Sequence, residues 1–251
     1  MRAASKITGA GVLADLGDFF EGRAPDLSAV AQPTRLENLR YVAGGFDLVA
    51  SQDPLRQRKL DLVRALVGLD ADVVVLDLPA GNAPATLDFF FLGDWKVVVT
   101  TPETAAFHDA YGFLKGYLLR RLLTEFRDRE DVLARTLEFY RGPESGSDRT
   151  VTALVRVLRD EFPEAWPEVA GILQDDAPHL ILNRVRGRRQ RGWLERFRLV
   201  VRKNLSLACP VLGTIPEDRR VAEALRHGLR ACWSTPIRPT RRSRSAGRAA
   251  G

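Results

Sequence analysis

Cysteine is scarce in this sequence, and long apolar runs are absent. Cys209 and Cys232 are the two cysteines among 251 residues, which is too few for a disulfide scaffold or a thiolate zinc site. No apolar run approaches the roughly 20 residues that cross a bilayer, and residues 1–6 do not begin an apolar leader. These absences favour a cytoplasmic protein over a secreted or membrane-spanning one.

Lysine is also scarce, and the basic charge is unevenly placed. Only five of the 38 basic residues are lysine. Residues 184–203 hold nine basic residues and one acid, whereas residues 237–251 hold five arginines and no acid. The net charge of +6 therefore comes from one basic segment and one basic end on a mildly acidic body. Residues 236–251 have almost nothing to bury, so we predict a basic disordered tail there.

Short apolar runs alternate with helical patterns along the rest of the chain. With 45% apolar and 28% charged residues, the composition is that of a globular protein. The spacing predicts an α/β fold with a mostly parallel sheet and helices on both faces. Thr100 and Glu103 have capping-box spacing before a long helix. We expect strands at 72–77, 96–100, 179–183 and 210–215, a weaker strand at 39–42, and helices at 54–69, after 100, within 126–175, from 193, and at 218–229.

The most informative stretch is the apolar run 73–76, which ends at Asp77 and continues as Leu-Pro-Ala-Gly81. A carboxylate at the carboxyl end of a strand orients Mg²⁺ in many nucleotidases, and a nearby glycine lets the backbone approach the γ-phosphate. The alternative is a sheet-edge aspartate that caps a helix beginning near Pro84. These residues alone leave both interpretations open, because a strand followed by Asp and a turn is common in α/β folds.

Several segments in order resemble the MinD/ParA family of deviant P-loop ATPases, especially its MinD and FlhG-like members. Asp77-Leu-Pro-Ala-Gly81 is similar to the D-x-P-A-G motif of Walker B and switch II, and residues 97–103 are similar to the strand that ends in T-x-P-E. Residues 180–184 resemble the strand whose Asn recognises adenine, and residues 212–218 resemble the G-x-I-P-x-D segment beside the base. The resemblance runs from about residue 13 to residue 229.

This resemblance implies a nucleotide-binding domain over residues 1–235 that uses ATP or ADP and Mg²⁺. It implies that Asp77 is the catalytic acid and orients Mg²⁺ through water. The implied activity is an ATP-dependent, dimerising switch that positions cell-division, flagellar or partition machinery. The implied cofactor-binding residues are Pro79, Ala80, Gly81, Asn183, Arg184, Pro216, Glu217 and Asp218.

One family feature is missing from the sequence. The family begins with a strand and a Walker A loop of the form K-G-G-x-x-K-[ST], but this sequence contains no G-K-[ST]. Residues 12–22 resemble a family segment that follows that loop, so we expect the first βαβ unit, roughly fifty residues, to be missing. The backbone N–H groups and lysines of that loop hold the phosphates. We therefore expect this chain to bind ATP weakly and to be inactive alone.

The basic stretch between Arg188 and Asn204 allows two interpretations. In the structural one, Trp193, Phe197 and Val200 pack on the sheet and the arginines are solvated. In the functional one, the same pattern binds anionic lipid or DNA phosphates, together with the tail. The alternative function is therefore a catalytically inactive binding module with a basic nucleic-acid- or membrane-facing surface. The family resemblance also implies a homodimer, a partner protein and peripheral attachment to the inner membrane.

Overall fold

The computed structural model describes residues 14–34, 36–44, 55–141 and 150–221. The helix expected at 218–229 begins at Arg219 and is described only to Val221. The tail expected at 236–251 and Cys232 lie outside the described residues.

Three strands form a parallel sheet in the order β3-β4-β5. They are β3 (Val97–Thr100), β4 (His179–Val185) and β5 (Val211–Pro216). Val98 is in register with Leu180, and Leu182 is in register with Thr214. The fold is therefore α/β with a parallel sheet, and three of the predicted strands are confirmed.

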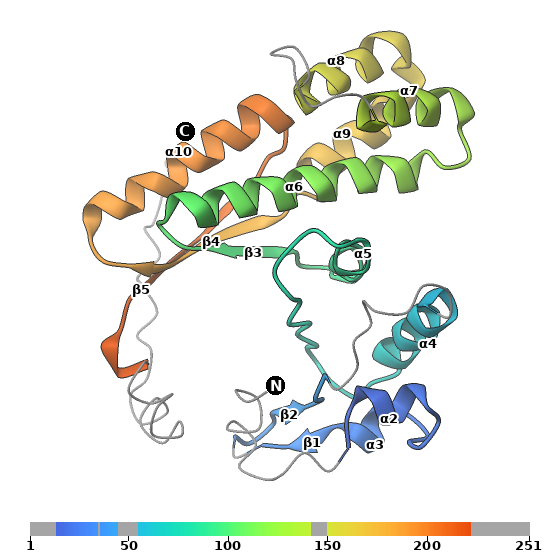
Figure 1. The fold of residues 1–251 in the computed structure, drawn as a ribbon, viewed down its shortest axis with the longest axis vertical. Coiled ribbons are helices and arrows are strands. Elements are labelled where there is room, and N and C mark those ends of the chain that lie inside the picture. Colours follow the sequence, from blue (N-terminus) through green and yellow to red (C-terminus); the bar gives the residue numbers. More distant parts are fainter. Residues whose placement is uncertain (1–13, 35, 45–54, 142–149, 222–251) are drawn as a thin grey trace, which may run out of the picture.

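Helices connect these strands and cover one face of the sheet (Figure 1). The connection from β3 to β4 begins with the long α6 and continues through α7, α8, the short η1 and α9, whereas α10 connects β4 to β5. Buried leucines of α6 and β4 belong to one large apolar cluster, the main core, together with residues from α5 to β5. Each fully buried large apolar side chain contributes about 1.5–3 kcal/mol, so this cluster dominates the stability. The helices are α5 (Pro84–Leu92), α6 (Thr104–Glu125), α7 (Glu130–Arg141), α8 (Val151–Glu161), the 3₁₀ helix η1 (Pro163–Ala165), α9 (Trp166–Gln174) and α10 (Arg188–Leu205).

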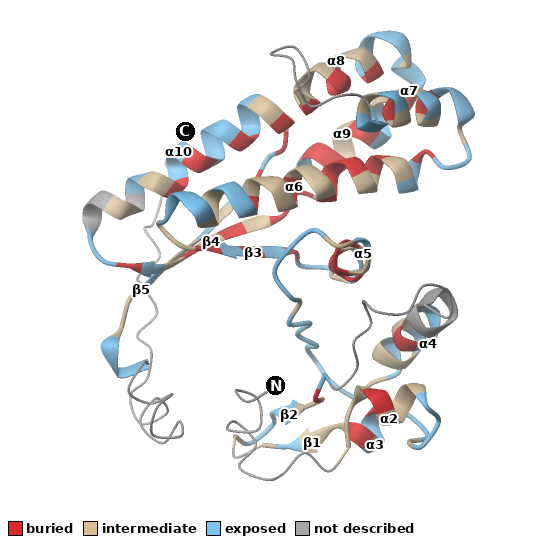
Figure 2. Ribbon diagram, viewed as in Figure 1, coloured by how far each residue is buried: buried red, intermediate tan, exposed pale blue. Residues whose placement is uncertain are grey.

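The opposite face of the sheet is not covered by helices of the described residues. Along β3, Val98 and Thr100 are buried, but Val97 and Val99 are exposed. Figure 2 shows the same division, with buried residues on the helices that pack against the sheet. The expectation of helices on both faces is therefore met on one face only.

A smaller region precedes this sheet in the chain. It contains α2 (Leu16–Phe20), α3 (Leu27–Val30), α4 (Leu55–Val67) and a two-residue antiparallel pair of β1 (Gln32–Pro33) with β2 (Arg40–Tyr41). Its second core is small, with Leu27, Val30, Leu62 and Phe89 as the buried members. Phe89 comes from α5, whose Leu87 and Phe90 belong to the main core, so α5 joins the two regions.

Two local predictions are wrong. Residues 72–77 form no strand, because a strand needs a neighbour for its N–H and C=O groups and no described segment pairs with them. Thr100 and Glu103 do not form a capping box. Thr100 ends β3, its hydroxyl donates to the carbonyl of Ala106 at 3.1 Å, and Glu103 makes no side-chain cap. Among the described helices, none combines the length and the apolar character needed to cross a membrane.

Candidate functional site

The carboxyl ends of the three parallel strands meet at one edge of the sheet. β4 ends in Asn183, Arg184 and Val185, and β5 ends in Pro216, which is in register with Val185. The N–H of Glu217 donates to the carbonyl of Val185 at 3.1 Å. Parallel α/β sheets bind ligands at this edge, because the loops after the strands converge there.

Arg184 lies near the end of β4, where the register with β5 shifts between Leu182 and Val185. Its φ of 58° lies in the left-handed region, which few residues other than glycine adopt without help. Here the N–H of Arg184 donates to Oδ1 of Asn183 at 2.8 Å, a local bond that favours such a turn. The Asn183 amide is therefore held at the sheet edge by its own backbone.

A cluster of ion pairs joins the three strand ends. The Arg184 guanidinium donates to Glu217 Oε1 at 3.2 Å and lies 4.0 Å from Glu103 Oε1. Arg186 donates to both Glu217 oxygens, at 3.0 Å for Nη2 to Oε1. Hydrogen bonds from Arg186, and then from Arg184, lower the pKa of Glu217. Arg184 and Arg186 are more than half exposed and Glu217 is partly exposed, so the two guanidiniums can exchange Glu217 for another anion at low cost.

Asp218 lies immediately after Glu217 and begins the last described turn. It accepts a hydrogen bond from the N–H of Arg220 at 2.9 Å and from the Arg220 guanidinium. The bonds from the Arg220 side chain lower the pKa of Asp218. Asp218 therefore caps the turn and carries a negative charge beside the cluster.

The other predicted site residues lie away from this sheet edge. Asp77 follows the extended run 73–76 and is exposed. Its charge acts on Tyr41 of β2, whose pKa is raised by burial first and by Asp77 second. Pro79, Ala80 and Gly81 lie on the same connection between α4 and α5, and Gly81 has a φ of +106°. The structure therefore brings Asn183, Arg184 and Glu217 together and places Asp77 beside the smaller region.

The amino edge of the sheet holds a network that the sequence analysis missed. Lys96 Nζ lies 2.5 Å from Asp176 Oδ1. Tyr117 donates from its hydroxyl to Asp176 Oδ2 at 2.8 Å, and Arg121 donates from Nε to the same oxygen at 3.1 Å. Burial raises the pKa of Asp176, but the hydrogen bonds from Lys96, Tyr117 and Arg121 lower it more, so its pKa lies below the usual value.

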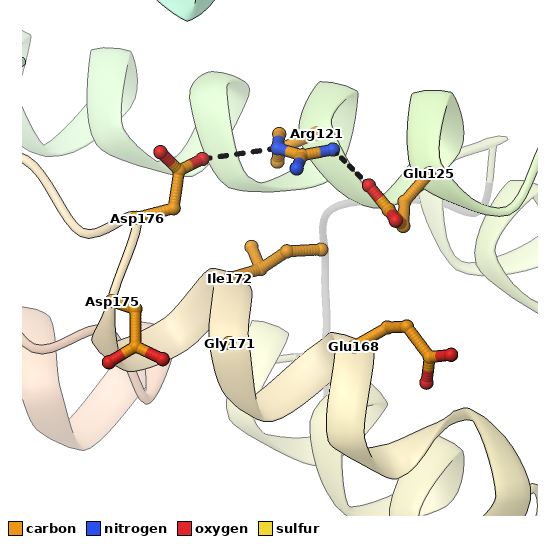
Figure 3. Close-up of a pocket in the computed structure, with 7 residues that line it drawn as sticks. All are labelled: Arg121, Glu125, Glu168, Gly171, Ile172, Asp175 and Asp176. Atoms are coloured by element: carbon orange, nitrogen blue, oxygen red, sulfur yellow. Dashed lines mark hydrogen bonds and ion pairs between the residues drawn. The ribbon is translucent and has the colours of Figure 1, made fainter. Parts of the chain in front are cut away.

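This network forms one wall of a shallow pocket of about 380 Å³ between α6 and α9. Figure 3 shows Arg121 between Asp176 and Glu125, with Glu168 and Ile172 on the facing helix. Glu125 and Asp176 are held by ion pairs with Arg121, which is the cation among the residues that line the pocket. Glu168 and Asp175 also line it and form no ion pair with a described residue. We interpret this edge as structural.

A second groove of about 610 Å³ runs between α6 and α10. Phe107 of α6 stacks on Phe197 of α10, with ring centroids 4.9 Å apart, and Trp193 lies 5.6 Å from Phe107. Phe197 is buried in the main core, as the structural interpretation predicted, and so is Val201, whereas Trp193 contacts α6 and not the sheet. Val200 remains exposed.

Metal-binding side chains do not cluster in the described ranges. No group of three or more His, Cys, Asp or Glu residues in them could hold an ion. The one described cysteine, Cys209, is buried, and burial raises its pKa to about 12, so its thiol stays protonated.

The chain matches no protein-family model, and no curated protein matches it.

Proposed function

We propose that the chain is a nucleotide-binding protein of MinD/ParA type, an ATP-dependent switch for positioning division, flagellar or partition machinery. One observation carries the proposal. The two segments that resemble the adenine pocket, at the ends of β4 and β5, lie side by side at the carboxyl edge of a parallel sheet. Their sequence order and their place in the fold both agree with the resemblance.

The roles of these residues follow from their chemistry. The Asn183 amide offers both a donor and an acceptor, which suits the edge of an adenine ring. Pro216 and Glu217 lie at the end of the neighbouring strand and would face the base from the other side, and Asp218 fixes the turn that follows. Arg184 supplies a cation that is balanced by Glu217. This edge therefore fits a base and its sugar.

The described residues do not fit the phosphates and Mg²⁺ equally well. In the family, Mg²⁺ neutralises the phosphate charge, and Asp77 would orient it through water. In this structure Asp77 lies near Tyr41 and the free cations of a phosphate cradle are absent from the described sheet edge. We therefore propose nucleotide recognition by this chain and derive no hydrolytic step.

Calorimetric titration with ATP and ADP in the presence of Mg²⁺ tests the proposal. We expect binding no tighter than micromolar, because the base pocket acts without a phosphate cradle. The N183A variant should abolish binding, and the matched N204A variant, on α10, should leave it unchanged. If the wild-type chain binds neither nucleotide, or if N183A binds as well as the wild type, the proposal is wrong.

A basic binding module is the second candidate, and α10 is the observation in its favour. Arg196, Arg202 and Lys203 of α10 are exposed, and none of them forms an ion pair with another described residue. Such cations bind polyanions by releasing counterions. We expect a duplex DNA shift that weakens steeply with salt and is reduced by the triple variant R196A/R202A/K203A. Binding to anionic vesicles but not to DNA would favour a membrane surface instead.

A further inference from the structure

The extended segment 73–76 has the character of a strand but no partner. Its residues form neither strand nor helix, and they make no backbone hydrogen bond to another described residue. Their exposed fractions alternate, at 78% for Val73, 43% for Val74, 84% for Val75 and 36% for Leu76. Three consecutive β-branched residues favour a strand, and an apolar segment with unpaired backbone is a template for strand pairing.

β3 is the complementary feature, because it lies at the edge of the sheet. β3 pairs with β4 on one side and with no described strand on the other. Its outer face carries Val97 and Val99, of which Val99 is 55% exposed. The described residues thus contain an unpaired apolar segment of four residues and an apolar edge strand of four residues that is paired on one side only.

The segment is attached to the smaller region and not to the sheet. Arg40 of β2 donates to the carbonyl of Asp70 just before it, and Asp77 just after it acts on Tyr41. Leu78 then packs against both cores. In Figure 1 the connection between α4 and α5 rises from the smaller region to α5 and does not lie alongside β3. To reach β3 of its own chain, the segment would have to separate from these contacts.

We propose that residues 73–76 bind the free edge of β3 in a second copy of this chain. The described sheet has two edge strands, β3 and β5, but β5 contains Gly213 and Pro216, which weaken strand pairing, so β3 is the better acceptor. A two-fold exchange of the segments between two copies pairs the segment and the β3 edge of each chain and forms a closed dimer. Asp72 and Asp77 flank the segment, and their charges disfavour continued stacking of strands, which limits the assembly to a pair. This dimer needs no nucleotide, so it is independent of the proposed function.

Sedimentation velocity on the full chain without nucleotide, across about two decades of concentration, tests the proposal. We expect a monomer–dimer equilibrium in the wild type. The V75K variant should weaken it roughly tenfold or more, because a charge would replace an apolar side chain in the strand pair. The matched control V67K changes an equally exposed valine, at 83%, at the end of α4 and should leave dimerisation unchanged.

Hydrogen exchange tests whether residues 73–76 are the segment that pairs with β3 in the dimer. We expect the amides of residues 73–76 to become protected as the dimer forms and to lose that protection in V75K. A monomer at every concentration would overturn the proposal. Protection that does not depend on concentration would also overturn it, because the occupant would then be β3 of the same chain. A dimer that V75K and V67K weaken equally would place the interface elsewhere.

Discussion

The two edges of the parallel sheet hold their charges in different ways. At the amino edge, Lys96 is only 9% exposed and shares Asp176 with Tyr117 and Arg121. At the carboxyl edge, Arg184 and Arg186 share Glu217 in the open solvent. Both edges join residues that are far apart in sequence. The two shared carboxylates are equally exposed, but Lys96 is nearly buried, whereas Arg184 and Arg186 are more than half exposed.

This difference separates stability from binding. A buried charge that loses its partner is strongly destabilising, so the amino edge cannot rearrange without loss of structure. Exposed ion pairs contribute little to stability, so the carboxyl edge can exchange its partners for a ligand. The following predictions test this division, beginning with the largest expected effect.

Removal of the Asp176 carboxylate at the amino edge should destabilise the protein most. The D176A variant leaves the Lys96 ammonium without its partner at 2.5 Å and removes an acceptor from Tyr117. We expect a loss of about 3 kcal/mol in the free energy of unfolding, measured by urea denaturation. The control D128A removes an aspartate that pairs with its neighbour Arg127 in an exposed position and should change little. Equal effects of the two variants would contradict a special role for the amino edge.

From the ion pair between Asp176 and Lys96 we also predict a loss of stability in acid. The usual pKa of Asp176 is 3.8, and its pKa in the folded protein is lower. The ionised carboxylate therefore stabilises the fold fully above the unfolded pKa, and this contribution disappears as the pH falls through the folded one. We expect the difference in unfolding free energy between wild type and D176A to shrink below about pH 4. A difference that stays constant down to pH 2 would show that lost packing, and not charge, explains the variant.

Tyr117 should contribute less than Asp176. Its buried hydroxyl donates to the carbonyl and to Oδ2 of Asp176, at 2.7 and 2.8 Å. The Y117F variant keeps the ring and its contacts with Phe90 but removes the hydroxyl, so we expect a loss of about 1 kcal/mol. The exposed Tyr140 provides the control Y140F, which should be neutral in the same urea titration.

Much of the sheet could be predicted from the sequence, because buried strands are apolar wherever their partners lie. The apolar runs at 97–100, 179–185 and 211–216 form the strands, although β3 is buried on one side only and β5 has no buried residue. The equally apolar run at 73–76 shows the limit of the argument. Apolar character shows that a segment favours burial, but a strand also requires a paired neighbour, and the sequence of one segment does not reveal it.

The site was predictable to the same extent. Asn183 and Glu217 could be placed together because the carboxyl ends of neighbouring parallel strands meet. Asp77 could be placed with them only if the segment 73–76 paired with a strand of the same sheet, and no described strand pairs with that segment. Lys96 and Asp176 are 80 residues apart. The sequence offered one sign of this contact. Lys96 directly precedes β3 and Asp176 lies three residues before β4, so the amino ends of these parallel strands bring opposite charges to one edge.

The smallest expected effect on stability belongs to Glu217 at the carboxyl edge. The E217A variant removes the partner of Arg184 and Arg186, but all three side chains are solvated and the arginines remain hydrated. We therefore expect no measurable change in the urea midpoint, since exposed pairs are screened by water. If this edge binds nucleotide, the same variant should change the calorimetric affinity for ADP several-fold, because it alters the charge beside Asn183. A variant that lowers the urea midpoint as much as D176A would show that the two edges are equally structural, and the division between them would fail.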